Sequence, residues 1–266
     1  MPVADDTDAL GETVERRGEG REGGGEDDSL PINELFCSLQ GEGQLAGVPS
    51  VFVRTSGCNL RCWFCDSYHT SWEPTGDWYG VADLVAAIGE FDADHVVLTG
   101  GEPLIHDASV DLLEALADRG YHTTVETNGT IYRDAPIDLA SVSPKLASST
   151  PTDERDPKGD GEWADRHEQR RLDVETLAQL LERYETQLKF VVTGPDDMDE
   201  VETLVSRVRA GTDATLPDDR VLLMPEGQTR EQLNETREVV AELAIEFGYR
   251  YTPRLHVDLW NDAPGT

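Results

Sequence analysis

The sequence predicts an α/β fold: a partial (open) TIM-like barrel of about six parallel βα units, preceded by a disordered N-terminal extension. From residue 50 onward, short β-rich runs alternate with segments whose apolar residues recur at helical spacing. Polar motifs follow several of these runs, where the βα loops of a parallel barrel surround one mouth. About six units are fewer than the eight that close a barrel, so we expect the sheet to stay open.

Residues 1–28 differ in composition from the rest of the chain. They are rich in Gly, Glu and Asp and contain few large apolar side chains. Such a segment buries too little apolar surface to offset the entropy lost on ordering, which predicts a disordered acidic extension. Residues 29–266 form the predicted catalytic domain, which is long enough for one substantial core.

The predicted strands and helices follow one another in βα order. The strands are expected near residues 51–54, 96–99, 123–126, 141–143, 188–192 and 221–224. Helical spacing of apolar residues predicts helices over 84–91, 112–116, 177–184, 201–208 and 239–247. Residues 147–171 are polar and charged without a clear period, which predicts a flexible insertion.

The chain is strongly acidic, with 54 Asp and Glu against 22 Lys and Arg and a formal charge of −32. Such a surface repels itself unless salt screens it, and the Debye length falls from roughly 8 Å at physiological salt to about 3 Å at 1 M. This predicts a salt-adapted protein, with an ordinary acidic protein as the alternative. Basic residues cluster only at 166–171, which argues against nucleic acid and favours a small-molecule substrate.

The sequence pattern predicts neither a membrane span nor an export signal. No apolar run approaches the ~20 residues that span a bilayer, and the N-terminus is acidic and Gly-rich where a signal peptide would be basic and then apolar. We therefore expect a cytoplasmic protein that does not contact a membrane.

Three of the four cysteines, Cys58, Cys62 and Cys65, form a Cys-x3-Cys-x2-Cys loop just after the first strong strand. This spacing is too tight for disulfides among them and indicates metal. Three thiolates can ligate three irons of a cubane and leave the fourth iron open, whereas structural iron–sulfur and zinc sites are normally closed by a fourth residue.

The cysteine loop resembles that of the radical S-adenosylmethionine (SAM) superfamily, in which the open iron is chelated by the methionine moiety of SAM. The resemblance implies a [4Fe-4S] cluster, SAM as cofactor, and reductive cleavage to a 5′-deoxyadenosyl radical. The alternative is a zinc-stabilised binding module with Cys37 as the fourth thiolate. Cys37 lies in an apolar-flanked segment and is interpreted instead as a small buried residue.

Further motifs at strand ends fit a cofactor site. Gly-Gly-Glu-Pro at 100–103 is alone a turn signal, with glycines that let a ligand approach the backbone. One βα unit after the cysteine loop, it resembles the superfamily motif that binds the methionine amino group, and the polar runs at 126–129 and 143–145 resemble segments that line the rest of the cofactor. Lys145 adds a cation for its carboxylate, with a surface lysine as the alternative. The implied cofactor-binding residues are Phe64, Asp66, Gly100, Gly101, Glu102, Thr127, Asn128, Ser143, Pro144 and Lys145.

The segment before the cysteines narrows the superfamily. Residues 36–44, Gly47-Val48-Pro49 and Phe52-Val53-Arg54 closely resemble the 7-carboxy-7-deazaguanine synthase family, and the resemblance covers residues 32–260. It implies conversion of 6-carboxy-5,6,7,8-tetrahydropterin to 7-carboxy-7-deazaguanine with loss of ammonia, on the route to preQ0, queuosine and archaeosine. The second candidate is a radical activase of a glycyl-radical enzyme, which shares the cysteine loop and the Gly-Gly-Glu-Pro turn.

A pterin substrate suits the residue types in this segment. Its amide and amine edges match Gln40, Glu42 and nearby backbone, and its carboxylate calls for a cation such as Arg54. The predicted substrate residues are Leu39, Gln40, Gly41, Glu42, Arg54, Thr99 and His256. A polar hairpin at Gln-Gly-Glu-Gly and a strand-edge charge at Arg54 are the alternatives.

The family resemblance implies three further partners. It places Mg²⁺ on the hydroxyl of Ser67, and a serine oxygen is a suitable ligand for this hard cation. It also implies a reduced flavodoxin- or ferredoxin-type electron donor and a homodimer.

Overall fold

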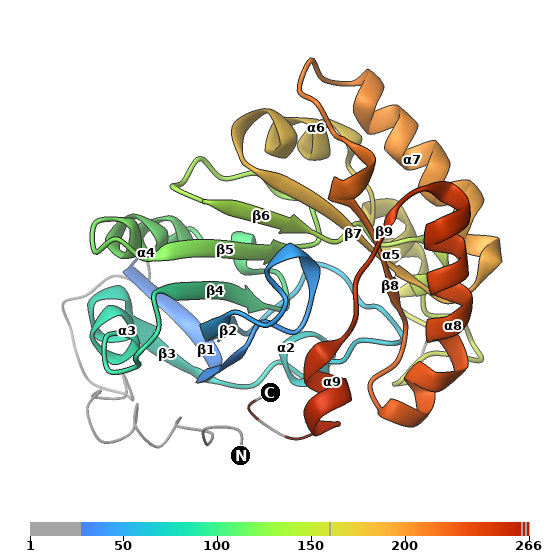
Figure 1. Cartoon of the computed structure of the whole chain (residues 1–266). Helices are drawn as coiled ribbons and strands as arrows, with labels where there is room; N and C mark the ends of the chain where they lie inside the picture. Colours follow the sequence, from blue (N-terminus) through green and yellow to red (C-terminus); the bar gives the residue numbers. More distant parts are fainter. Residues whose placement is uncertain (1–27, 160, 262, 264, 266) are drawn as a thin grey trace.

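The computed structural model describes residues 28–159, 161–261, 263 and 265, so the predicted N-terminal extension, apart from Asp28, lies outside the described residues. Figure 1 shows one curved sheet with helices around its outer side. Its nine strands follow the order β3-β1-β2-β4-β5-β6-β7-β8-β9, and β3 and β9 do not pair with each other. The predicted open barrel is therefore confirmed.

Neighbouring strands pair in parallel along the run β2-β4-β5-β6-β7-β8-β9. At the other end of the sheet, β1 pairs antiparallel with both β2 and β3. Their bounds are β1 (Ser29–Leu39), β2 (Pro49–Thr55), β3 (Asp77–Gly80), β4 (His95–Gly100), β5 (His122–Thr127), β6 (Leu139–Val142), β7 (Thr186–Val192), β8 (Val221–Pro225) and β9 (Arg250–Tyr251). All six predicted strands are present, and β6 ends one residue earlier than expected.

Three strands escaped the sequence prediction for different reasons. β1 carries a proline and is buried on both faces near its start, so it shows no period-2 alternation. β3 and β9 are edge strands of only four and two residues. Short edge strands leave too little pattern to detect.

All five predicted helices are present and cover the outer face of the sheet. They are α3 (Val81–Ile88), α4 (Ala108–Ala117), α6 (Val174–Arg183), α7 (Met198–Ala210) and α8 (Arg230–Phe247). Their apolar stripes pack on the strands in one continuous core, in which Leu84, Leu112 and Leu180 are fully buried. α8 begins with a capping box between Thr229 and Gln232.

Shorter elements occupy the loops. They are α2 (Tyr68–Ser71), α5 (Ala164–Arg170), α9 (Leu255–Trp260) and the 3-10 turns η2 (Gly43–Leu45), η3 (Pro103–Ile105), η4 (Ala147–Ser149), η5 (Pro195–Asp197) and η6 (Asp218–Arg220). Residues 147–171, expected to be a flexible insertion without a clear period, contain η4 and α5. Only one residue of α5, His167, is buried, so the sequence offers no apolar period there.

A small second cluster fills the inside of the barrel. It consists of Phe36, Phe52 and Val97. The rings of Phe36 and Phe52 stack with their centroids 5.0 Å apart, and Phe52 also borders the cavity described below. Through Phe52 this cluster therefore contributes to the lining of that cavity.

No helix within the described ranges combines the length and the apolar character that crossing a membrane requires.

Candidate functional site

A cavity of about 1250 Å³ opens at the carboxyl ends of the parallel strands. All but two of the site residues predicted from the sequence line it. These are Leu39, Gln40, Gly41, Glu42, Arg54, Cys58, Cys62, Phe64, Cys65, Asp66, Ser67, Thr99, Gly100, Gly101, Thr127, Asn128, Ser143, Lys145 and His256. The barrel therefore gathers segments distant in sequence around one space.

Glu102 and Pro144 are the two predicted residues that do not border the cavity. Glu102 is fully buried behind its wall. Its carboxylate accepts hydrogen bonds from the amides of Leu104 and Asn128 and from the hydroxyl of Thr127, at 2.7 to 3.1 Å. Through these hydrogen bonds Glu102 joins the turn after β4 to the end of β5.

The two glycines of the Gly-Gly-Glu-Pro turn permit a close backbone approach. A Cβ on Gly100 would lie 2.1 Å from the carbonyl oxygen of Thr55, and one on Gly101 would lie 2.2 Å from that of Gly57. Gly100 also has a φ of 132°, which favours glycine. The turn thereby packs against the backbone that leads into the cysteine loop, a role beyond the expected approach of a ligand.

The three motif cysteines face the same cavity. Their loop is closed by a 3.3 Å hydrogen bond from the amide of Cys65 to the carbonyl of Cys62. Among the described residues, no three His, Cys, Asp or Glu side chains are arranged to hold a single metal ion. Three thiols with no fourth protein ligand suit a cluster with one open iron better than a closed zinc site.

Cys37 does not complete a zinc site. It pairs with Val51 in the β1–β2 ladder and is absent from the residues that line the cavity. Cys37 is also half-buried and not, as expected, fully buried. The zinc alternative therefore lacks its proposed fourth ligand.

Burial favours the protonated form of the motif thiols in the metal-free chain. It raises the pKa of Cys58 to about 12 and also raises the pKa values of Cys62 and Cys65. Donors that would stabilise thiolates are already in place: the Leu60 amide lies 3.4 Å from Cys58 Sγ, and the Ser71 hydroxyl lies 3.1 Å from Cys65 Sγ. Metal binding here would release protons and gain from these donors.

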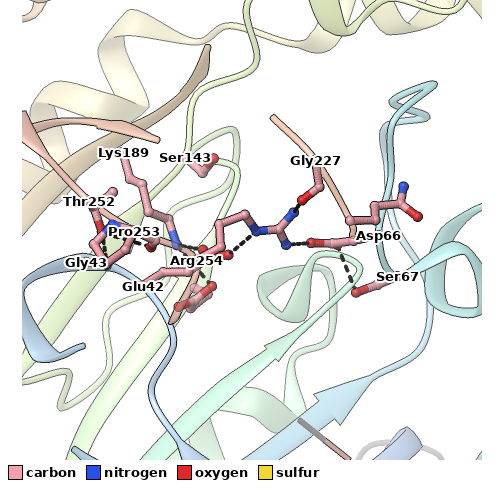
Figure 2. A network of polar contacts seen from close by, with 12 residues as sticks. Glu42, Gly43, Asp66, Ser67, Ser143, Lys189, Gly227, Thr252, Pro253 and Arg254 are labelled. Atoms are coloured by element: carbon pink, nitrogen blue, oxygen red, sulfur yellow. Dashed lines mark hydrogen bonds and ion pairs between the residues drawn. The ribbon is translucent and has the colours of Figure 1, made fainter. Parts of the chain in front are cut away.

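Glu42 lies at the centre of a buried charged network (Figure 2). Its carboxylate contacts Lys189 Nζ at 2.5 Å and Arg254 Nε at 3.0 Å. Burial alone would raise the pKa of Glu42, but the two cations outweigh it and hold the pKa below the ordinary range. Glu42 is therefore a carboxylate, with its charge compensated from two sides.

Arg254 connects three loops at the cavity mouth. Besides Glu42, it pairs through Nη2 with Asp66 and donates through Nη1 to the carbonyl of Gly227 at 2.6 Å. These partners lie in the loop after β1, at the end of the cysteine loop and after β8. The guanidinium is 7% exposed, so it acts as a buried tie.

Lys189 extends the network to β5. It projects from β7, is 3% exposed, and contacts Glu126 at 3.4 Å as well as Glu42. The side-chain amide of Gln40 donates to Glu126 at 3.1 Å. Lys189 bridges the two carboxylates at the wall that the predicted substrate residues also form.

Lys189, Arg254 and Glu126 are cavity residues that the sequence prediction missed. Lys189 did give a signal in the sequence, because a charged residue is unusual inside an apolar strand such as TQLKFVV. Lysine is also scarce in this chain, which contains only three. Arg254 and Glu126 belong to polar runs already noted. Their contacts are with residues far away in the sequence, and the local sequence pattern does not predict such contacts.

Arg54 and Ser67 continue the polar wall of the cavity beyond Asp66. Arg54 pairs with Glu34 at 2.7 Å and donates to the Ser67 hydroxyl at 2.9 Å. Ser67 in turn donates to Asp66 at 3.2 Å. The charged wall thus runs without interruption to the end of the cysteine loop.

Lys145 lies apart from this wall. Its ammonium donates to the Ser143 hydroxyl at 2.7 Å, and within the described part of the chain it forms no ion pair. An ammonium without a carboxylate partner is available to an anionic ligand. Lys145 therefore provides a positive charge on the cysteine side of the cavity.

His256 packs directly on Gly41. A Cβ on Gly41 would lie 1.8 Å from Nδ1 of His256, and the amide of Leu255 donates to the Gly41 carbonyl at 2.8 Å. The absence of a side chain at Gly41 therefore admits the imidazole to the cavity beside the loop after β1.

Comparison with known proteins gives a consistent assignment. The model of the Radical SAM superfamily matches residues 52–148. The chain is 66% identical to the 7-carboxy-7-deazaguanine synthase of Halobacterium salinarum over the full length of both. It is 44% identical to that of Rhodopirellula baltica, with 90% of this chain and 89% of the relative aligned.

A solved structure agrees with these relatives. The crystal structure of QueE from Escherichia coli matches with a TM-score of 0.60 at 29% identity, over 86% of this chain and 95% of that one. The similarity thus includes nearly the whole neighbour and most of the barrel described above.

Proposed function

This chain belongs to the 7-carboxy-7-deazaguanine synthase family of radical SAM enzymes, and on this premise we propose which of its residues perform each part of the reaction. The enzyme acts in 7-deazapurine biosynthesis, converting 6-carboxy-5,6,7,8-tetrahydropterin to 7-carboxy-7-deazaguanine with loss of ammonia. One observation carries the residue assignment: three thiols and a buried charged network line the same cavity.

Cys58, Cys62 and Cys65 hold the [4Fe-4S] cluster. Their number fits a cluster with one iron left open, and none of the three is in a disulfide. When bound, the cluster and SAM together supply a carbon-centred radical that abstracts hydrogen from the substrate. The protein supplies position, charge compensation and exclusion of water.

Lys145 and the strand ends beside it bind SAM. The ammonium of Lys145 and the hydroxyl of Ser143 offer donors to a carboxylate. Thr127 and Asn128 border the same part of the cavity. Glu102 acts from behind the wall, where its bonds to both residues hold the end of β5 in place.

The wall formed by Gln40, Glu42, Arg54, Lys189 and Arg254 binds the pterin. An ionised, buried carboxylate such as Glu42 accepts hydrogen bonds from the amine and ring N–H groups of a pterin. The cations compensate Glu42 and attract the carboxylate of the substrate. A protein segment, as an activase would bind, does not require this set of paired charges, so the geometry favours the small polar substrate.

Mg²⁺ is proposed on the hydroxyl of Ser67, supported by the neighbouring Asp66. The two side chains place hard oxygen atoms 3.2 Å apart at the edge of the cavity. Mg²⁺ prefers such oxygens and keeps several waters, so few protein ligands suffice. A reduced flavodoxin- or ferredoxin-type donor and a homodimeric state are likewise proposed from the family resemblance.

The test is a reconstituted assay under anaerobic conditions at high salt, with SAM, a reductant, Mg²⁺ and carboxytetrahydropterin. We expect 7-carboxy-7-deazaguanine and 5′-deoxyadenosine together. Formation of 5′-deoxyadenosine without the deazaguanine product would contradict the assigned substrate and leave only the superfamily. Bound zinc without iron or sulfide would contradict the cluster itself.

A further inference from the structure

His167 is buried in a helix that otherwise lies at the surface. It is 0% exposed, and it is the only buried residue of α5. A buried imidazole is costly unless both of its ring nitrogens are hydrogen-bonded. The hydrogen-bond partners of the His167 ring therefore identify the segments that this side chain connects.

Both ring nitrogens of His167 are engaged, and the partners fix the tautomer. The backbone amide of Arg61 donates to Nδ1 at 3.1 Å. Nε2 lies 2.9 Å from the Ser149 hydroxyl, which gives its own hydrogen to the carbonyl of Leu146 at 2.6 Å. The ring is thus neutral, with its hydrogen on Nε2 and an acceptor at Nδ1. Burial agrees with this state, because it lowers the pKa of His167 to about 4.

The amide that Nδ1 accepts from lies inside the cysteine motif. Arg61 stands between Cys58 and Cys62, and its side chain donates to the carbonyl of Cys58 at 2.7 Å. Among the described residues, no other group accepts a hydrogen bond from this amide. Within this spacing the imidazole therefore holds a backbone amide, whereas the bonds to Thr130 and Asn128 are made by the side chain of Asn59.

The neighbouring residue Trp63 is anchored to the same segment. Its backbone amide donates to the carbonyl of Ser149 at 3.2 Å, and its indole N–H donates to that of Ser148 at 2.7 Å. Three donors of the cysteine loop thus end on residues 148–167. These bonds hold the side of the loop that faces away from the cavity.

We infer that His167 is a positioning residue for the iron–sulfur cluster, because its Nδ1 fixes the backbone between Cys58 and Cys62 so that both thiols face the cavity. The inference rests on the proposed function in one respect, since it takes these cysteines to be the cluster ligands. Residues 147–171, which the sequence suggests are a flexible insertion, then include a support of the metal site.

A different role for His167 would be to fill space between α5 and the barrel. A side chain of similar size would then serve equally well, whichever way its polar atoms point. Asn and Gln separate the two roles, because Asn places its amide oxygen near the position of Nδ1 and Gln places its polar group near Nε2. Only Asn can keep an acceptor on the Arg61 amide.

The experiment compares His167→Asn, His167→Gln and His167→Ala with wild type after anaerobic reconstitution at high salt. Gln169→Ala is the matched control, since Gln169 is exposed on the same helix. The readouts are iron and sulfide per chain, and the rate at which a chelator removes the iron. Circular dichroism reports whether each variant is folded.

We expect the Gln and Ala variants to lose iron about tenfold faster than wild type, the usual size of effect for a residue that supports a metal ligand. Asn should restore most of the retention, and Gln169→Ala should match wild type. Equal loss rates for the Asn and Gln variants would overturn the inference, even where the Ala variant fails to fold. A wild-type chain that takes up no iron and sulfide would instead overturn the proposed function, and this inference with it.

Discussion

The guanidinium of Arg254 pairs with the carboxylate of Asp66 across 188 positions of sequence. The pair connects the segment after β9 to the residue that follows the last motif cysteine. Because Arg254 also binds Glu42, one side chain joins the proposed metal side and the proposed substrate side of the cavity. Removing the Arg254 guanidinium should therefore affect both the metal side and the substrate side of the cavity.

Arg254→Met should destabilise the protein and weaken pterin binding. It leaves the buried carboxylate of Glu42 with one cation and Asp66 without its partner, and breaking a buried pair in this way costs about 3–5 kcal/mol. Denaturant unfolding at fixed high salt measures the loss, and the KM for the pterin should rise in the same variant.

The control for this variant is Arg237→Met. Arg237 pairs with Asp258 at 3.0 Å, but both side chains are about one-third exposed, so the loss should stay below about 1 kcal/mol. Equal losses in the two variants would contradict the description of Arg254 as a buried tie.

Cys62→Ser should abolish SAM cleavage without unfolding the chain, because the cysteine loop lies at the barrel mouth, outside the main core cluster. Cys37→Ser is the matched control and should keep full iron content, since Cys37 does not border the cavity. Iron analysis, 5′-deoxyadenosine formation and circular dichroism are the measurements. Loss of iron from the Cys37 variant would revive the four-cysteine site.

The three lysines of the chain allow a clean comparison of the two halves of the cavity. Lys189→Met should raise the KM for the pterin by about tenfold or more, which corresponds to ~1.4 kcal/mol, because Glu42 and Glu126 lose a shared cation. Lys145→Met should weaken SAM binding instead. Lys158 is exposed, and Lys158→Met should change neither. Isothermal titration with each ligand distinguishes the effects, and identical profiles for the Lys145 and Lys189 variants would contradict the proposed division.

Stability should fall in mild acid, in part because of His95. Its ring nitrogens lie 2.7 Å from the Ser50 hydroxyl and 2.8 Å from that of Thr124, and burial, with a smaller effect of His122, lowers its pKa from 6.5 to about 4. As the pH falls from 6.5 to about 4, His95 therefore binds a proton in the unfolded chain but stays neutral in the folded chain. The cost reaches at most about 3 kcal/mol.

Unfolding free energies of wild type and His95→Gln between pH 7 and about 4 test this expectation. Glutamine keeps a polar group at the site but does not titrate, so the variant should show a shallower pH dependence. Parallel curves for the two proteins would assign the acid sensitivity to other groups.

Local patterns were sufficient for six of the parallel strands and for the five long helices, and the family resemblance supplied most of the cavity lining. Periodicity reports a buried face, and motif spacing reports a loop. What the sequence could not supply are contacts between distant segments: the ties made by Arg254, the bridge at Lys189 and the burial of His167. Glu102 is a further case, since its motif gave no sign of its hydrogen bonds to Thr127 and Asn128 at the end of β5.

The tie between Arg254 and Glu42 also has a consequence for synthesis on the ribosome. The two residues are 212 positions apart, so Glu42 emerges long before its guanidinium partner exists. Lys189 is synthesised earlier and can pair with Glu42 before Arg254 exists, but the ligand-binding pocket cannot take its final shape until Arg254 is added. Chain completion, and not the formation of the first strands, would set the earliest moment at which the catalyst can begin to work.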